Sequence, residues 1–324
     1  MGHKPRIDSQ ESLTPRYAHY RRWLCAAHPG LESRLVRGPM IRGTWREVSE
    51  KYEIILLDAF GVLNLGDQVI PGAPEAVAAL QERGKTVRVV SNNASQSPAG
   101  IAKRLQKMGF NLSVEQIVSS GMAAVSFVAE SDYRDRPYFL VGSEESVSAY
   151  APNPERLMVN RSGSPLPLEA AESILFCSNR DYHGGAQEAE LLRLLSKKRV
   201  PILLANPDLA TPKPDGRLEA VAGYAAFDLA ERFELKIVGI GKPFPPIFQE
   251  VKRCFPDVPA ERFLMVGDTL DTDVLGAVVM GFGSCLTLSG ACAGWGEALE
   301  SLCDARGIRP DCVISSLGDF LLEC

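Results

Sequence analysis

A short apolar run that ends in an aspartate constrains the fold of this chain more than any other feature. Ile54-Ile55-Leu56-Leu57 leads directly into Asp58, and Gly61 and Gly66 follow. A run of β-branched and leucine residues bounded by a glycine turn is typical of a buried parallel strand. Open α/β sheets bind their ligands at the carboxyl ends of such strands. Asp58 is therefore predicted to lie at a ligand-binding edge of a sheet.

The composition is that of a globular protein with more than one domain. The chain has 324 residues, which fits two domains better than one. Its net charge of −5 argues against nucleic acid or an anionic membrane as the main partner. No apolar run approaches the roughly 20 residues needed to cross a bilayer. The eight cysteines form no Cys-x-x-Cys pair, so we expect free thiols in a reducing cytoplasm rather than a zinc site or disulfides.

Predicted strands and helices alternate in two stretches of the chain. The predicted strands in these stretches are 54–58, 86–90, 236–240, 263–266 and 284–288. Helical patterns lie between them, and this βαβα order is the signature of a doubly wound parallel sheet. The middle of the chain carries strands of its own. These are predicted at 138–142, 173–177 and 200–205.

The pattern predicts an α/β core with a second α/β domain inserted into it. The core would comprise residues 46–121 and 236–324, and the inserted domain would comprise 122–235. Residues 1–45 are predicted to form a helical extension that packs on the outside or makes an oligomer contact. The aromatic residues in the middle of this extension are Tyr17, Tyr20 and Trp23. No chemistry is evident in it.

Reactive side chains follow four predicted strands of the core. They are Asp58, Ser91, Lys242 and Asp268. Because the carboxyl ends of neighbouring parallel strands share one edge of the sheet, these groups can meet in one crevice. Taken singly, each has an ordinary structural explanation, such as a helix cap for an aspartate or a serine. Their order and spacing together favour a functional site.

The segments around these residues resemble, in the same order, the four motifs of the haloacid-dehalogenase-like (HAD) superfamily. They lie at 58–62, 91–93, 241–243 and 267–273. The insertion between the second and third motifs implies a class II cap. Two inserted segments, 140–145 and 204–208, resemble the IIA branch, which includes 4-nitrophenyl phosphatases and sugar-phosphate phosphatases. The resemblance leaves the N-terminal extension unexplained.

The resemblance implies phosphoryl transfer to Asp58, followed by hydrolysis of the aspartyl phosphate. It implies Mg²⁺, a cation that prefers oxygen ligands. The implied metal site consists of Asp58, the backbone carbonyl of Phe60, Asp268 and, as a ligand or a support, Asp273. The implied phosphate-binding residues are Ser91, Asn92 and Lys242, of which Lys242 would neutralise the anions. The candidates for selecting the substrate from the cap are Asn179, Arg180, Asp181 and, as the best pair, Asn206 and Asp208, which flank a stiffening proline.

Phe60 departs from the motif. The phosphatases that the chain resembles carry an aspartate there, which protonates the leaving oxygen and then activates water. Losing such a group costs typically about 10²–10⁴ in rate, or roughly 3–5 kcal/mol. No clear substitute is present in the sequence. Asp67 lies beyond the turn, and Asp208 or His183 would have to swing in from the cap.

Two functions of different classes remain open on this basis. The first is a Mg²⁺-dependent phosphatase that acts on a small phosphorylated metabolite and is slowed by Phe60. The second is a phosphometabolite-binding or regulatory protein that kept the pocket and lost catalysis. Phosphotransfer to another acceptor and dehalogenation use the same kind of nucleophile, although dehalogenases have a different cap and do not need Asp268. A homodimer is also expected, because caps of this branch often pair, whereas nucleic acid and membrane are not expected as partners.

Overall fold

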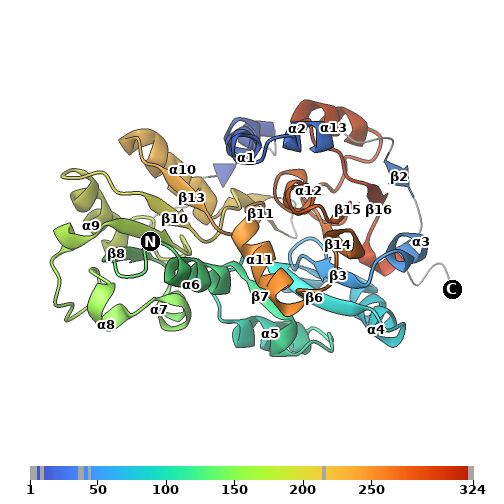
Figure 1. Ribbon diagram of the computed structural model, residues 1–324, viewed down its shortest axis with the longest axis horizontal. Helices are drawn as coiled ribbons and strands as arrows, with labels where there is room; N and C mark the ends of the chain where they lie inside the picture. The colour runs from blue at the N-terminus through green and yellow to red at the C-terminus, as the bar shows by residue number, and fades with distance from the viewer. Residues whose placement is uncertain (1–5, 8–10, 36–39, 43–44, 214–216, 320–324) are drawn as a thin grey trace.

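Seven parallel strands form the larger sheet of the computed structural model, which describes residues 6–7, 11–35, 40–42, 45–213 and 217–319 (Figure 1). Their order is β2-β16-β15-β14-β3-β6-β7, and every neighbouring pair is parallel. Their bounds are β2 Ile41–Arg42, β3 Ile54–Leu57, β6 Thr86–Ser91, β7 Ile117–Ser119, β14 Phe263–Gly267, β15 Gly283–Thr287 and β16 Cys312–Ile314. The predicted doubly wound parallel fold is confirmed.

The central strand β3 shows why the sheet is covered on both faces. Ile55 and Leu57 pack into one buried cluster, with apolar residues of α4 and α5. Ile54 and Leu56, which point the other way, pack into a second cluster, with residues of α11. Because successive side chains of a strand alternate between its faces, an uninterrupted apolar run needs helices on both sides. The core helices are α3 Trp45–Glu50, α4 Ala73–Glu82, α5 Pro98–Lys107, α11 Pro245–Cys254, α12 Leu275–Met280 and α13 Leu299–Arg306.

A second, four-stranded parallel sheet forms the centre of the inserted unit, which we call the cap. Its order is β13-β10-β9-β8. Its strands are β8 Tyr138–Val141, β9 Ser173–Phe176, β10 Ile202–Leu204 and β13 Ile237–Gly239. The helices of this part of the chain are α6 Ser120–Glu130, α7 Glu144–Tyr150, α8 Pro154–Leu157, α9 Ala186–Leu195 and α10 Ala222–Phe233. One face of this sheet packs in a cluster of its own with α9 and α10, and the other face packs in the cluster that holds Ile54 and Leu56 of β3.

Strand β13 belongs to the cap, and the prediction that 236–240 begins the second half of the core is wrong. Ile237 is paired in parallel with Ile202 of β10. Lys242 consequently does not follow a core strand. It lies on the segment that returns from the cap sheet to helix α11. A three-residue apolar strand carries no signal of which sheet it joins, so the sequence pattern could not place it.

The N-terminal segment contacts both units. Its helices are α1 Thr14–Ala27 and α2 Leu31–Leu35, and α1 lies between α10 of the cap and α12 of the core (Figure 1). The segment also supplies strands. Strand β1 (Arg6–Ile7) pairs with β12 (Leu218–Ala220) in a small sheet with β11 (Ala210–Pro212), and β2 pairs with β16 at the edge of the core sheet.

Short elements complete the described chain. They are the hairpin strands β4 Asn64–Leu65 and β5 Gln68–Val69, the 3-10 turns η1 Glu11–Leu13, η2 Val114–Gln116, η3 Leu168–Ala170 and η4 Ala260–Arg262, and the π-helical turn η5 Leu270–Val274. None of the described helices combines the length and the apolar character needed to span a lipid bilayer.

Candidate active site

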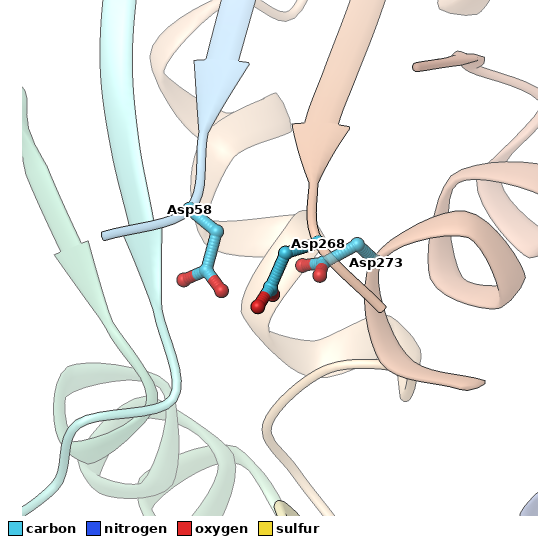
Figure 2. A group of neighbouring side chains, drawn as sticks. All are labelled: Asp58, Asp268 and Asp273. Atoms are coloured by element: carbon cyan, nitrogen blue, oxygen red, sulfur yellow. The ribbon is translucent and has the colours of Figure 1, made fainter. Parts of the chain in front are cut away.

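Three carboxylates meet at the carboxyl edge of the core sheet. Asp58 follows β3 and Asp268 follows β14, and these two strands are neighbours in the sheet. Asp273 lies in η5, one turn beyond Asp268. Each residue offers a carboxylate oxygen within 4.8 Å of those of the other two. Figure 2 shows Asp58 and Asp268 at their strand ends, with both carboxylates directed into the same space.

Lys242 lies behind these carboxylates and neutralises two of them. Its Nζ is 2.8 Å from Asp58 Oδ1 and 2.7 Å from Asp273 Oδ1, and the side chain is 1% exposed. Burial alone lowers the pKa of Lys242, but Asp273 and Asp58 raise it by more, so the net pKa lies above its usual value. Lys242 therefore remains an ammonium ion at the centre of the site.

Asp273 is better placed to hold Lys242 than to bind a cation. Its Oδ1 accepts from Lys242, and its Oδ2 accepts from the backbone N–H of Thr269 at 3.2 Å and from Thr269 Oγ1 at 2.8 Å. Both oxygens are thus in use. The predicted part of Asp273 in the metal shell stays a prediction, with the supporting role favoured by these bonds.

The Asp58 and Asp268 carboxylates lie close together, and Lys242 is the basic group that acts on the pKa of both among the described residues. Burial raises the pKa of Asp58, and Lys242 offsets only part of the effect. Burial also raises the pKa of Asp268, and the charges of Asp58 and Asp273 raise it further. Two buried carboxylates that oppose each other's ionisation favour the binding of a cation between them.

At two glycines the backbone approaches Asp268 too closely for any side chain to fit. A Cβ at Gly61, whose φ is +82°, would lie 2.0 Å from Asp268 Oδ2, and a Cβ at Gly290 would lie 2.1 Å from the same atom. The N–H of Ala291 donates to this oxygen at 2.6 Å. The donors are all oxygens, which fits a hard divalent cation. The predicted ligand role of the Phe60 carbonyl stays a prediction, and no hydrogen bond within the described ranges uses that oxygen.

Ser91 ends β6, the other neighbour of β3, and Asn92 follows it. Ser91 is buried, and its Oγ accepts from the N–H of Asn93 at 3.2 Å. The Asn92 amide is already engaged, because its Oδ1 accepts from the Lys242 N–H at 2.7 Å and its Nδ2 donates to the Lys242 carbonyl at 3.0 Å and to Asp208 Oδ1 at 2.8 Å. Asn92 therefore joins the lysine segment to the cap rather than presenting a free amide.

A cavity of about 420 Å³ lies between the core edge and the cap. The predicted residues that line it are Asp58, Phe60, Asp67, Ser91, Asn92, Asn179, Arg180, Asn206, Asp208 and Asp268. Asp181 and His183 do not line it, and their predicted roles stay predictions. Burial raises the pKa of Asp208 to about 6, against the opposing effects of Lys242 and Asn92.

Arg104 and Tyr17 also line the cavity, and the sequence analysis missed both. The Arg104 guanidinium carbon lies 5.1 Å from the centre of the Phe60 ring, and among the described residues no carboxylate forms an ion pair with it. In sequence, Arg104 is one of several basic residues on an amphipathic helix, a pattern typical of a solvated face. Tyr17 comes from α1, which is distant in sequence from every motif. No local pattern identifies either residue.

Comparisons with known proteins agree with this geometry. Residues 55–152 match the family described as haloacid dehalogenase-like hydrolase, and residues 239–320 match a family described as HAD-hydrolase-like. The two matches together span more than half of the chain. Human glycerol-3-phosphate phosphatase is 29% identical over an alignment of 296 residues, gaps included, that covers 83% of this chain and 90% of that protein.

Solved structures share the fold. The 4-nitrophenylphosphatase of Thermotoga maritima is 25% identical, with a TM-score of 0.68, over 86% of this chain and 98% of that one. The glycerol phosphate phosphatase of Mycobacterium tuberculosis, solved in complex with magnesium, has a TM-score of 0.68 at 23% identity, over 87% of this chain and 78% of that one.

Proposed function

Since this chain belongs to the haloacid dehalogenase-like hydrolases, in their class IIA branch, we propose that it is a Mg²⁺-dependent phosphatase acting on a small phosphorylated metabolite. One observation carries the proposal. The Asp58 and Asp268 carboxylates share a buried space, and the Lys242 ammonium lies 2.8 Å from Asp58. Similarity to proteins named as phosphatases, one of them solved with magnesium, supports it.

The two carboxylate oxygens of Asp58 have different contacts and would have different roles. Oδ1 accepts from the Ala59 N–H at 2.7 Å and pairs with Lys242, which leaves Oδ2 as the oxygen that would attack phosphorus. Lys242 would stabilise the charge that gathers on the transferred group. Asp58 and Asp268 would hold Mg²⁺, which when bound supplies neutralisation of these carboxylates and polarisation of the phosphate. Ser91, at the adjoining strand end, would donate to a phosphate oxygen.

Phe60 narrows the range of substrates. Its ring can neither protonate a leaving oxygen nor activate water, and the half-buried ring lines the cavity beside Arg104. Aryl and acyl phosphates have weakly basic leaving oxygens that need little protonation, so the rate of their hydrolysis would be lowered least. The lack of an acid–base side chain at position 60 is also the observation that favours the second function. In that function the protein binds a phosphometabolite in the same pocket and does not turn it over.

Metal removal tests the proposal. With an aryl phosphate as substrate, we expect chelation by EDTA to lower the rate of phosphate release at least about tenfold. Added Mg²⁺ should restore the rate, because a site whose donors are all oxygens prefers a hard cation. Release that persists unchanged in EDTA would contradict the metal requirement. If instead calorimetry detects Mg²⁺-dependent binding of a phosphometabolite and no phosphate is released over hours, the binding-protein function replaces the phosphatase.

The raised pKa values predict how stability depends on pH and metal. Burial raises the pKa of Asp58, and raises that of Asp208 to about 6, whereas both would ionise near 4 in the unfolded chain. Between these values the metal-free folded state binds more protons than the unfolded state, so its stability falls as the pH rises.

Mg²⁺ needs ionised carboxylates, so we expect it to raise Tm more at about pH 7.5 than at about pH 5. Thermal unfolding with and without the metal measures the difference, and Asp268→Asn should remove it. Equal shifts at both pH values in the unmodified protein would count against a carboxylate site.

We place the reaction in the reducing cytoplasm, where free thiols persist. The described cysteines are all free. The homodimer inferred from the sequence stays a prediction.

A further inference from the structure

We propose that Tyr17 and Tyr20, from the N-terminal helix α1, are positioning residues of the active site, which hold the substrate loop of the cap over Asp58. The substrate loop is defined as residues 206–209, and it contains Asn206 and Asp208. The proposal deepens the proposed function and rests on it for its catalytic readout. It also assigns a role to a segment in which the sequence showed no chemistry.

Both tyrosines bond to the backbone of this loop. Tyr20 Oη donates to the Pro207 carbonyl at 2.6 Å, and the N–H of Leu209 donates to Tyr17 Oη at 3.4 Å. Tyr20 is fully buried and Tyr17 is 4% exposed. Buried backbone groups need partners, and here the partners come from a helix almost 200 positions away in sequence. Tyr17 also lines the cavity itself.

The spacing on α1 explains how one helix face reaches the loop. Tyr17, Tyr20 and Leu24 lie at i, i+3 and i+7, which puts them on a single face. They pack in one buried cluster with Leu209 of the loop and Leu270 of the core. Helix α1 therefore packs where the two units meet, against both the substrate loop and η5.

Anchors on each unit fix α1 in this position. On the cap, Arg16 pairs with Glu231 of α10 at 2.9 Å, and the Trp23 ring stacks on Phe227 with centroids 5.7 Å apart. On the core, Arg21 Nη1 donates to the Arg306 carbonyl at 3.1 Å. A helix bound to both units resists a change in their relative position.

The other contacts of the loop connect it to the catalytic groups. Asp208 Oδ1 accepts from Asn92, whose side chain also bonds twice to the backbone of Lys242. The Asp208 carbonyl accepts from the N–H of Gly223 at 3.0 Å, and a Cβ at Gly223 would lie 2.3 Å from the Pro207 carbonyl oxygen. The loop is therefore held by the core, the cap and α1. Displacing it would move Asp208 relative to Lys242 and Asp58.

The test removes one hydroxyl and compares it with a matched control. Tyr20→Phe deletes the bond to Pro207, while Tyr138→Phe deletes an equivalent bond of a buried tyrosine, from Oη to the Pro152 carbonyl at 2.8 Å, far from the site. We expect amide hydrogen exchange in 205–209 to accelerate about threefold to tenfold in Tyr20→Phe and not in Tyr138→Phe. Equal exchange of this segment in the two variants would overturn the proposal.

A double-mutant cycle supplies the catalytic readout. We expect Tyr20→Phe to raise KM about threefold to tenfold for an aryl phosphate with little change in kcat, since the loop contacts substrate and not the transferred phosphoryl group. In an Asp208→Asn background the same substitution should have almost no further effect, because it acts through that residue. If the KM increases of the two single variants multiply in the double variant, Tyr20 acts independently of Asp208. Its role is then merely structural, and the proposal is overturned. A protein without any phosphatase activity would refute the proposed function, while the exchange measurement would still decide the role of Tyr20.

Discussion

Asp58→Asn should lower turnover on the order of 10⁴-fold or more, because it removes the carboxylate that we propose attacks phosphorus. The substitution keeps the shape of the side chain, and an amide oxygen can still face Lys242. Lys242 also keeps its 2.7 Å contact with Asp273, so the lysine remains paired and the fold should survive. Binding of inorganic phosphate should weaken far less than turnover, since Ser91 and Lys242 remain in place.

Steady-state kinetics with an aryl phosphate, together with calorimetric titration of inorganic phosphate, separates the two effects. Asp257→Asn is a suitable control, because it makes the same change at an exposed position of the core. Turnover in Asp58→Asn that equals turnover in the control would remove Asp58 as the nucleophile. Loss of phosphate binding in parallel with turnover would instead indicate that the amide disrupts the pocket.

The residues that the sequence could locate are those that follow core strands. Asp58 and Asp268 follow β3 and β14, and Ser91 ends β6. These strands are neighbours in the sheet, and the doubly wound pattern alone brings their ends together. Lys242 was predicted to lie beside them at the end of a core strand. It does lie beside Asp58, but another segment carries it there. It arrives on the segment that leaves the cap strand β13, whose pairing with β10 depends on contacts that no short apolar run encodes.

The remaining site residues depend on tertiary packing. Arg104 reaches the cavity because α5 packs in the same cluster as Phe60, and Tyr17 reaches it because α1 contacts both units. Nothing within a few residues of either position distinguishes it from an ordinary helix residue. The sequence also could not show that the side-chain amide of Asn92 joins the Lys242 segment to Asp208, and its predicted phosphate-binding role stays a prediction. The local sequence pattern indicates which strand ends carry reactive residues. The role of each residue follows from its contacts in the folded protein.

Phe60→Asp should raise turnover of alkyl phosphates by about 10²-fold, the lower end of what a general acid–base group contributes. The lower end is expected because of Arg104. Its guanidinium carbon lies 5.1 Å from the Phe60 ring centre. That positive charge would lower the pKa of a carboxyl group placed there, so less of it would be protonated at neutral pH and able to donate a proton. Aryl phosphates should gain less, because their leaving oxygens need little protonation.

The matched control is Phe60→Asn, which removes the same ring and adds a side chain of the same size that cannot transfer a proton. Both variants lose the packing of a half-buried ring against the core cluster, so thermal unfolding of each must first show an intact fold. An alkyl phosphatase rate in Phe60→Asp no higher than in Phe60→Asn would mean that position 60 does not face the leaving group. A rate that rises in Phe60→Asp, with an alkaline limb that shifts to higher pH when Arg104→Gln is added, would show that the guanidinium sets the pKa of the new acid.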